Sequence, residues 1–129
     1  MNDDEFYYAD TDFLLALLKP EDWLKENAEK LYEKYQGKIF TSETGITEIM
    51  LCCKKYDLDV MNYVTSVCSF VEIINGKKEF YVQAAYFMKE FGLTTFDSIH
   101  AAYSKMKDLP IISSERKYDE LGINKIQLK

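Results

Sequence analysis

The hydrophobic pattern of the chain alternates between short apolar runs and longer segments whose apolar residues recur every three or four positions. The short runs predict strands at residues 6–9, 38–41, 71–74, 110–113 and 123–128. The longer segments predict helices at about residues 11–18, 23–35, 44–56, 59–69, 80–91 and 95–106. Strands separated by helix-length segments favour right-handed crossovers and therefore a mainly parallel sheet.

Two helix ends can be placed from single residues. Asp22 is a suitable N-cap for the second helix, which is then expected to begin at Trp23, with this residue as part of its apolar pattern. Gly92 follows the most regular amphipathic segment, residues 80–91, and is the expected end of that helix.

These elements predict an α/β fold. We expect a three-layer sandwich in which a central, mainly parallel sheet of about four to five strands is flanked by helices. The length of 129 residues suits one domain, and no repeat or linker divides the chain, so residues 1–129 are expected to form a single domain. In such sheets ligands bind beyond the carboxyl ends of the strands, so the residues that directly follow each strand are the first candidates for a site.

The composition excludes several classes of protein. With 47% hydrophobic and 15% aromatic residues, the chain is too apolar to be disordered. Its first residues are acidic where a signal peptide would be basic, and the early apolar run at 13–18 is too short to span a bilayer. We therefore expect a soluble, cytoplasmic protein with no membrane partner. The formal charge of −6 argues against broad attraction to nucleic acid, so such a substrate would require a bound cation or a basic partner.

Four acidic residues occur where a parallel sheet would place a site. Asp10 directly follows the first strand, and Glu115 lies just after the fourth strand, next to Ser114. Asp97 belongs to the first turn of a helix, where the positive end of the helix dipole stabilises an anion. Glu48 lies in mid-helix with apolar neighbours three and four residues further on, so we expect it to be half buried.

Converging carboxylates would suit a hard metal ion. They raise one another's pKa values unless a cation compensates, and Mg²⁺ or Mn²⁺ prefers oxygen ligands. Each acid also has a simpler interpretation as a solvated surface residue, and Asp97 could merely cap its helix. Asp12, Ser114 and Asp119 are weaker candidates, as groups that orient ligands. His100, the single histidine, shares a helix face with apolar residues, away from Asp97, and is interpreted as a core residue without chemistry.

Four segments of the chain resemble the sequence blocks of the PIN domain, especially of VapC-like ribonuclease toxins from prokaryotic toxin–antitoxin pairs. The most telling is the segment at residues 94–102, which is similar to the family's Asp-x-x-x-Ala-Ala helix and would make Asp97 a metal-binding acid. The segments at 8–15, 40–48 and 111–119 resemble the blocks that carry the other acids. The chain departs from the family at Asp12, at Glu115, which replaces an Asp, and at Lys117, which stands where many members have a further acid.

The resemblance implies a PIN-like, Rossmann-like fold and a specific chemistry. The protein would be an endoribonuclease that depends on Mg²⁺ or Mn²⁺ and hydrolyses phosphodiester bonds in single-stranded RNA. Its catalytic and metal-binding residues would be Asp10, Glu48, Asp97 and Glu115. As in other VapC-like proteins, a homodimer and an antitoxin partner are expected.

Two alternatives remain open. One is a PIN-like assembly or RNA-processing module that has lost catalysis, for which Glu115 and Lys117 are the motive. The other is a response-regulator receiver, but this class needs a phosphoacceptor Asp after a mid-chain strand, where the chain has Asn75 and Gly76.

Overall fold

The computed structural model describes residues 5–129, in which strands and helices alternate as predicted. The elements in chain order are β1 (Tyr7–Ala9), α1 (Thr11–Leu18), α2 (Lys25–Tyr35), β2 (Ile39–Ser42), α3 (Glu43–Tyr56), α4 (Val60–Phe70), β3 (Glu72–Ile74), α5 (Lys78–Phe91), α6 (Thr95–Lys107), β4 (Ile111–Ser113), the 3-10 helix η1 (Arg116–Glu120) and β5 (Lys125–Gln127). Among the described residues, none of the helices has both the length and the apolar character that crossing a bilayer requires.

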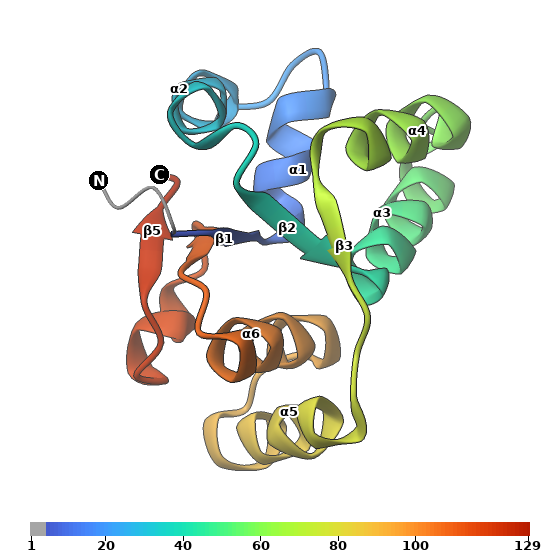
Figure 1. Cartoon of the computed structure of the whole chain (residues 1–129). Coiled ribbons are helices and arrows are strands. Elements are labelled where there is room, and N and C mark those ends of the chain that lie inside the picture. The colour runs from blue at the N-terminus through green and yellow to red at the C-terminus, as the bar shows by residue number, and fades with distance from the viewer. Residues whose placement is uncertain (1–4) are drawn as a thin grey trace.

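The five strands form one parallel sheet in the order β3-β2-β1-β4-β5 (Figure 1). The chain first builds outwards from β1 to β3, then crosses over to add β4 and β5 on the other side of β1. The strand order therefore reverses between β1 and β4, which pair through Tyr8 with Ile111 and Ala9 with Ile112. This reversal confirms the predicted sheet and brings the carboxyl ends of β1 and β4 side by side.

Helices α1 to α4 cover one face of the sheet, and α5 and α6 cover the other (Figure 1). Because side chains alternate along a strand, β1 supplies both cores. Tyr7 and Ala9 pack into the cluster formed with α1 to α4, whereas Tyr8 packs into the cluster formed with α5 and α6. In β4, Ile112 and Ile111 divide in the same way. The sheet is thus buried on both faces, and the predicted three-layer arrangement is confirmed.

Three helices begin beside the carboxyl edge of the sheet, each with a side-chain cap. The Asp10 carboxylate accepts a hydrogen bond from the backbone N–H of Thr11 at the start of α1. Ser42 caps α3 through the N–H of Gly45, and Thr94 caps α6 through the N–H of Asp97. The caps fix where each helix starts, and so they fix the positions of the acids in its first turns.

Two local predictions were wrong. The second helix begins at Lys25 rather than at Trp23, because the Asp22 side chain accepts from the N–H of Leu24 in a turn that precedes the helix. Trp23 is consequently 73% exposed and is not part of the core. The segment after β4, for which the hydrophobic pattern predicted no helix, contains η1, since the Glu115 side chain caps it and the buried ring of Tyr118 anchors it.

Candidate metal centre

Asp10 lies at the centre of the site, directly after β1. Only 5% of the residue is exposed. Its Oδ1 accepts from the N–H of Thr11 at 2.8 Å, and its Oδ2 accepts from the Ser113 hydroxyl at 2.6 Å, at the end of β4. The two strands at the topological reversal therefore hold this carboxylate from both sides. Ser113, which sequence reasoning did not single out, is its partner across the sheet.

Glu48 extends from α3 toward Asp10. Its side chain is 21% exposed, as its half-apolar helix face predicted. Oε1 accepts hydrogen bonds from the Thr11 hydroxyl and from His100 Nε2, the latter at 2.7 Å. The second carboxylate of the site is thus held by one residue from α1 and one from α6.

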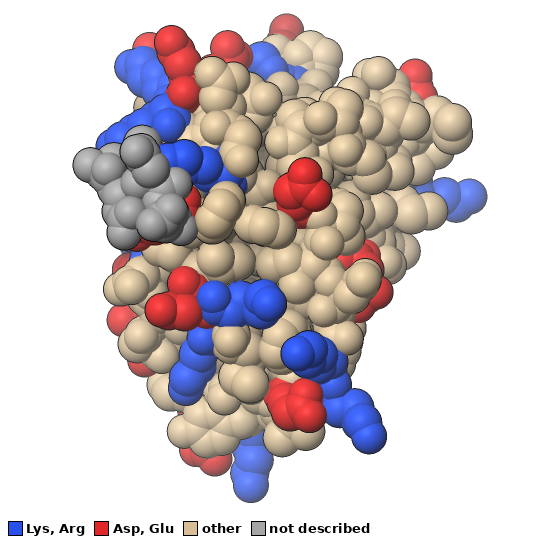
Figure 2. All heavy atoms as spheres, viewed as in Figure 1, with Lys and Arg blue, Asp and Glu red and all other residues tan. Residues whose placement is uncertain are grey.

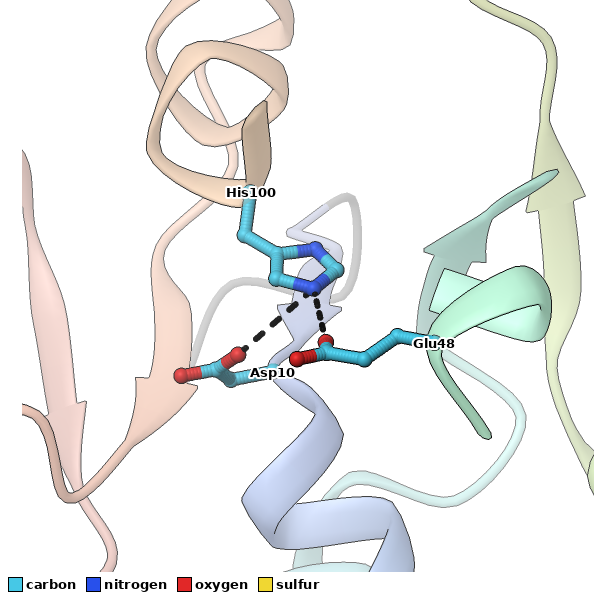
Figure 3. Close-up of side chains that lie close together, drawn as sticks. All are labelled: Asp10, Glu48 and His100. Atoms are coloured by element: carbon cyan, nitrogen blue, oxygen red, sulfur yellow. Dashed lines mark hydrogen bonds and ion pairs between the residues drawn. The ribbon is translucent and has the colours of Figure 1, made fainter. Parts of the chain in front are cut away.

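His100 completes the cluster from α6 and was underestimated from the sequence. It is fully buried, as expected of a core residue, yet one nitrogen of its ring points toward both acids (Figure 3). Nε2 lies 3.9 Å from Asp10 Oδ1, and Nδ1 lies 2.7 Å from the Tyr8 hydroxyl. One ligand-type atom from each of Asp10, Glu48 and His100 falls within 4.8 Å of the others. The spacing of three residues from Asp97 was the available signal, since such residues share a helix face.

Asp97 lies in the first turn of α6, half buried beside the cluster. The Tyr118 hydroxyl donates to the Asp97 backbone carbonyl at 3.2 Å and lies 3.5 Å from its Oδ1. The cap of this helix is Thr94 and not Asp97, and Asp97 lies close enough to Glu115, Glu48 and Asp10 for their charges to act on one another.

Asp12 and Ser114 form a second contact between α1 and the β4 end. Asp12 Oδ2 accepts from the Ser114 N–H at 2.9 Å and also from the Ser114 hydroxyl. The other oxygen, Oδ1, is buried and has no hydrogen-bond partner among the described residues. An unpartnered buried carboxylate oxygen is costly unless a cation or water satisfies it.

Glu115 and Asp119 occupy different places from those expected of inner ligands. The Glu115 side chain accepts from the Lys117 N–H at 3.1 Å and caps η1, although its charge still acts on Asp97. Asp119 is exposed and forms an ion pair with Lys125 at 2.9 Å. Glu115 thus lies at the rim of the acidic cluster, whereas Asp119 is engaged with β5.

The electrostatics of the cluster favour a cation. Burial, together with the charges of Asp12 and Asp97, raises the pKa of Asp10 from 3.8 to about 7. Burial likewise raises the pKa of Asp12 and of Asp97. Burial opposes ionisation of Glu48, but the hydrogen bond and charge of His100 and the hydrogen bond from Thr11 together outweigh that cost and lower the pKa of Glu48. Burial also opposes protonation of His100, yet Glu48 and Asp10 raise its pKa.

These residues fit a divalent ion. The carboxylates of Asp10 and Glu48 lie within reach of one ion, the charges of Asp12 and Asp97 act on Asp10, and hard oxygen donors are what Mg²⁺ and Mn²⁺ prefer. A cation here would offset both the burial and the mutual repulsion that raise the pKa values of Asp10 and Asp97.

The family follows from the sequence as a whole. The family model described as the PIN domain matches residues 7–124. The chain belongs to the PIN domain family. The resemblance that the four sequence blocks carry is therefore confirmed. No curated protein matches the sequence closely enough to count as a relative.

Solved structures share this PIN fold over nearly their whole length. A toxin–antitoxin complex from Klebsiella pneumoniae matches with a TM-score of 0.76 at 20% identity, over 95% of this chain and 98% of that chain. The sarcin-ricin loop cleaving toxin VapC20 from Mycobacterium tuberculosis matches with a TM-score of 0.77 at 14% identity, over 94% and 98%. DNA-bound VapBC from Salmonella typhimurium gives 0.72 at 13% identity, over 97% and 99%. At these identities the likeness is one of fold.

Proposed function

We propose that this PIN domain is an Mg²⁺- or Mn²⁺-dependent endoribonuclease that hydrolyses phosphodiester bonds in single-stranded RNA and acts as a VapC-like toxin. The observation that carries the proposal is the convergence of carboxylates from separate elements, namely Asp10 and Asp12 from the β1–α1 junction, Glu48 from α3 and Asp97 from α6. Like charges gathered at one edge of a sheet repel one another unless a cation compensates them or a proton neutralises one of them, and phosphodiester hydrolysis is chemistry that a bound divalent cation supports.

Asp10 and Glu48 would hold the ion, with Asp97 beside them and Glu115 at the rim. When bound, the ion would supply Lewis acidity that activates a water and stabilises the leaving oxygen. The protein's own residues would control the protonation and the orientation of the carboxylates. Asp10, whose pKa burial raises to about 7, would keep a proton at acidic pH and would have to be ionised to serve as an oxygen donor. Ser113 and Tyr118 fix the orientation of Asp10 and Asp97.

The test is an RNA cleavage assay with the intact chain, with and without Mg²⁺, comparing wild type with Asp10→Asn. The matched control is Asp108→Asn, an exposed residue at the other end of α6 whose left-handed backbone, with φ of 53°, Asn tolerates. We expect Mg²⁺-dependent cleavage of single-stranded RNA by wild type and by the control, and none by Asp10→Asn. Retained cleavage by Asp10→Asn refutes the assignment. Metal binding without cleavage of any RNA indicates the module without catalysis.

We also propose an antitoxin protein as partner and a homodimeric state. The support is an exposed apolar surface on α3 and α4, which Figure 2 shows as a region with few charged side chains. A hollow of about 580 Å³ between these helices includes the exposed residues Met50, Leu51 and Val60, and it begins one residue from Glu48, at Thr47. Apolar patches of this kind mark interaction surfaces. Among the fold neighbours, the Klebsiella structure is a toxin–antitoxin complex.

Both partner proposals can be checked on purified protein. Light scattering should give twice the mass of the chain, and replacing Leu51 with Asp should change either that mass or the capture of the protein encoded next to this gene. A monomer that captures nothing, with Leu51→Asp behaving like wild type, contradicts both.

A further inference from the structure

A series of buried side chains, joined by hydrogen bonds, lies behind the acidic cluster. The Ser42 hydroxyl lies 2.7 Å from the Tyr8 hydroxyl, which in turn lies 2.7 Å from His100 Nδ1. On the other side of the ring, Nε2 lies 2.7 Å from Glu48 Oε1. Ser42, Tyr8 and His100 are all fully buried. This series of hydrogen bonds starts and ends at the same helix, because Ser42 caps α3 and Glu48 projects from it.

The direction of these hydrogen bonds decides the role of the imidazole. A glutamate is ordinarily a carboxylate at neutral pH and can then only accept, so in the 2.7 Å contact His100 Nε2 must carry the hydrogen that it shares with Glu48. A nitrogen that carries a hydrogen has no free lone pair, so it is not a metal ligand. The Tyr8 hydroxyl then satisfies Nδ1, whichever of the two carries the hydrogen between them.

The hydrogen bonds to Glu48 hold one of its two carboxylate oxygens and leave the other one free. The hydrogen bonds from His100 and Thr11 both end on Oε1. Among the described residues, Oε2 receives no side-chain hydrogen bond, so it stays free to bind a cation. A long side chain such as Glu loses conformational freedom when it is held in this way, and that loss no longer has to occur on metal binding.

We propose that His100, fixed by Tyr8, is a positioning residue that orients Glu48 for the metal through an Nε2–H donor, and is not itself a ligand. This inference rests on the proposed metal-dependent function and adds a residue to it. His100 is neither the inert core residue of the sequence prediction nor the third ligand that its position among the acids suggests.

The first test uses the fact that the chain has one histidine. In untagged, ¹⁵N-labelled protein, the two imidazole nitrogens can be observed without ambiguity by NMR. We expect Nε2 to carry a hydrogen without metal and to keep it when Mg²⁺ is added. Loss of that hydrogen on Mg²⁺ addition makes His100 a ligand and overturns the proposal, as does a metal-free protein in which Nε2 carries none. This test needs no variant.

The second test compares His100→Gln with His100→Met by Mn²⁺ calorimetry. The two side chains have similar volume, but only Gln offers an N–H at the position of Nε2. Because groups that orient metal ligands contribute about 10- to 100-fold to metal affinity, Met should weaken binding by that factor, whereas Gln should stay within about threefold of wild type. Equal affinities for the two variants overturn the proposal.

Tyr8→Phe tests the hydrogen bond between the Tyr8 hydroxyl and His100 Nδ1. It should weaken Mn²⁺ binding, since the ring of His100 loses its second anchor. The matched control is Tyr103→Phe, which removes another buried hydroxyl from the same stacked ring pair, but one that contacts Glu43 at 3.3 Å rather than the site. Equal effects of the two variants contradict the role of Tyr8. If the wild-type chain binds neither Mn²⁺ nor Mg²⁺, the proposed function fails, and the NMR result still decides the hydrogen bond between His100 and Glu48.

Discussion

Replacing Asp10 with Asn should stabilise the metal-free protein at pH 8 while it abolishes cleavage. In the folded state burial raises the pKa of Asp10 from 3.8 to about 7. Between these values the folded state keeps a proton that the unfolded state has released, so the free energy of unfolding falls as the pH rises from about 4 to about 7. The raised pKa values of Asp12 and Asp97 act in the same direction.

The size of the effect follows from the pKa of Asp10. A change from 3.8 to about 7 corresponds to about 4 kcal/mol, at about 1.36 kcal/mol per pH unit. Asn removes this cost because it is neutral at every pH; its oxygen can accept from the Thr11 N–H, and its amide nitrogen can donate to the Ser113 hydroxyl. It also removes the attraction between Asp10 and His100, so we expect a gain of about 2 kcal/mol at pH 8, within an upper bound of about 4 kcal/mol.

The assay is thermal unfolding of both proteins from pH 5 to pH 8, with and without Mg²⁺. At this chain length about 2 kcal/mol corresponds to a rise in Tm of roughly 6 °C. Without metal, wild type should lose stability as the pH rises, and Asp10→Asn should lose less. Mg²⁺ should restore wild type at pH 8 and leave the variant unchanged, because only wild type binds the ion. A variant less stable than wild type at pH 8 without metal, or a wild type indifferent to pH, refutes the reasoning.

Three further predictions concern the supports of the site. Gly45→Ala places a Cβ in steric conflict with the buried Thr41 hydroxyl, so either this side chain or α3 must shift. We expect a loss of about 1–3 kcal/mol in chemical denaturation, and Thr41→Ala in the same chain should restore most of it. Ser113→Ala removes the hydroxyl that donates to the Asp10 carboxylate, so it should raise the pKa of Asp10 further. The pH midpoint of Mn²⁺ binding, measured by calorimetry, should therefore move upward, and a downward move contradicts this. Lys25→Met removes an ammonium that donates to the Leu17 and Lys19 carbonyls at 2.9 and 3.0 Å, and should cost about 1–2 kcal/mol in thermal unfolding without any change in Mn²⁺ affinity.

Much of the fold could be predicted because local pattern and global topology agree. Helix α1 has the predicted bounds, and α5 ends at Gly92 with φ of 67°, as its position after an amphipathic segment indicated. The start of α2 could not be predicted, since Asp22 can cap either a helix or the turn that precedes one, and only the tertiary structure decides between them.

The acids of the site were predictable for a different reason. Residues that directly follow parallel strands must lie at one edge of the sheet, and this rule identified Asp10 without any knowledge of side-chain contacts. The rule does not say in which direction a side chain points. For this reason Asp119 was a candidate for the site, although it forms an ion pair with Lys125. The hydrogen bond between Tyr8 and His100 joins residues 92 positions apart. It could not be predicted from the sequence, because an apolar helix face alone predicts burial and not hydrogen bonding.

The most direct measurement is anomalous diffraction from crystals of the wild-type protein grown with Mn²⁺. The account predicts a manganese peak between Asp10 and Glu48, about 2.1 Å from at least one carboxylate oxygen or from a water that these residues bind. It also predicts that His100 Nε2 stays bound to Glu48 rather than to the ion. Saturating Mn²⁺ with no peak at this edge of the sheet contradicts the account.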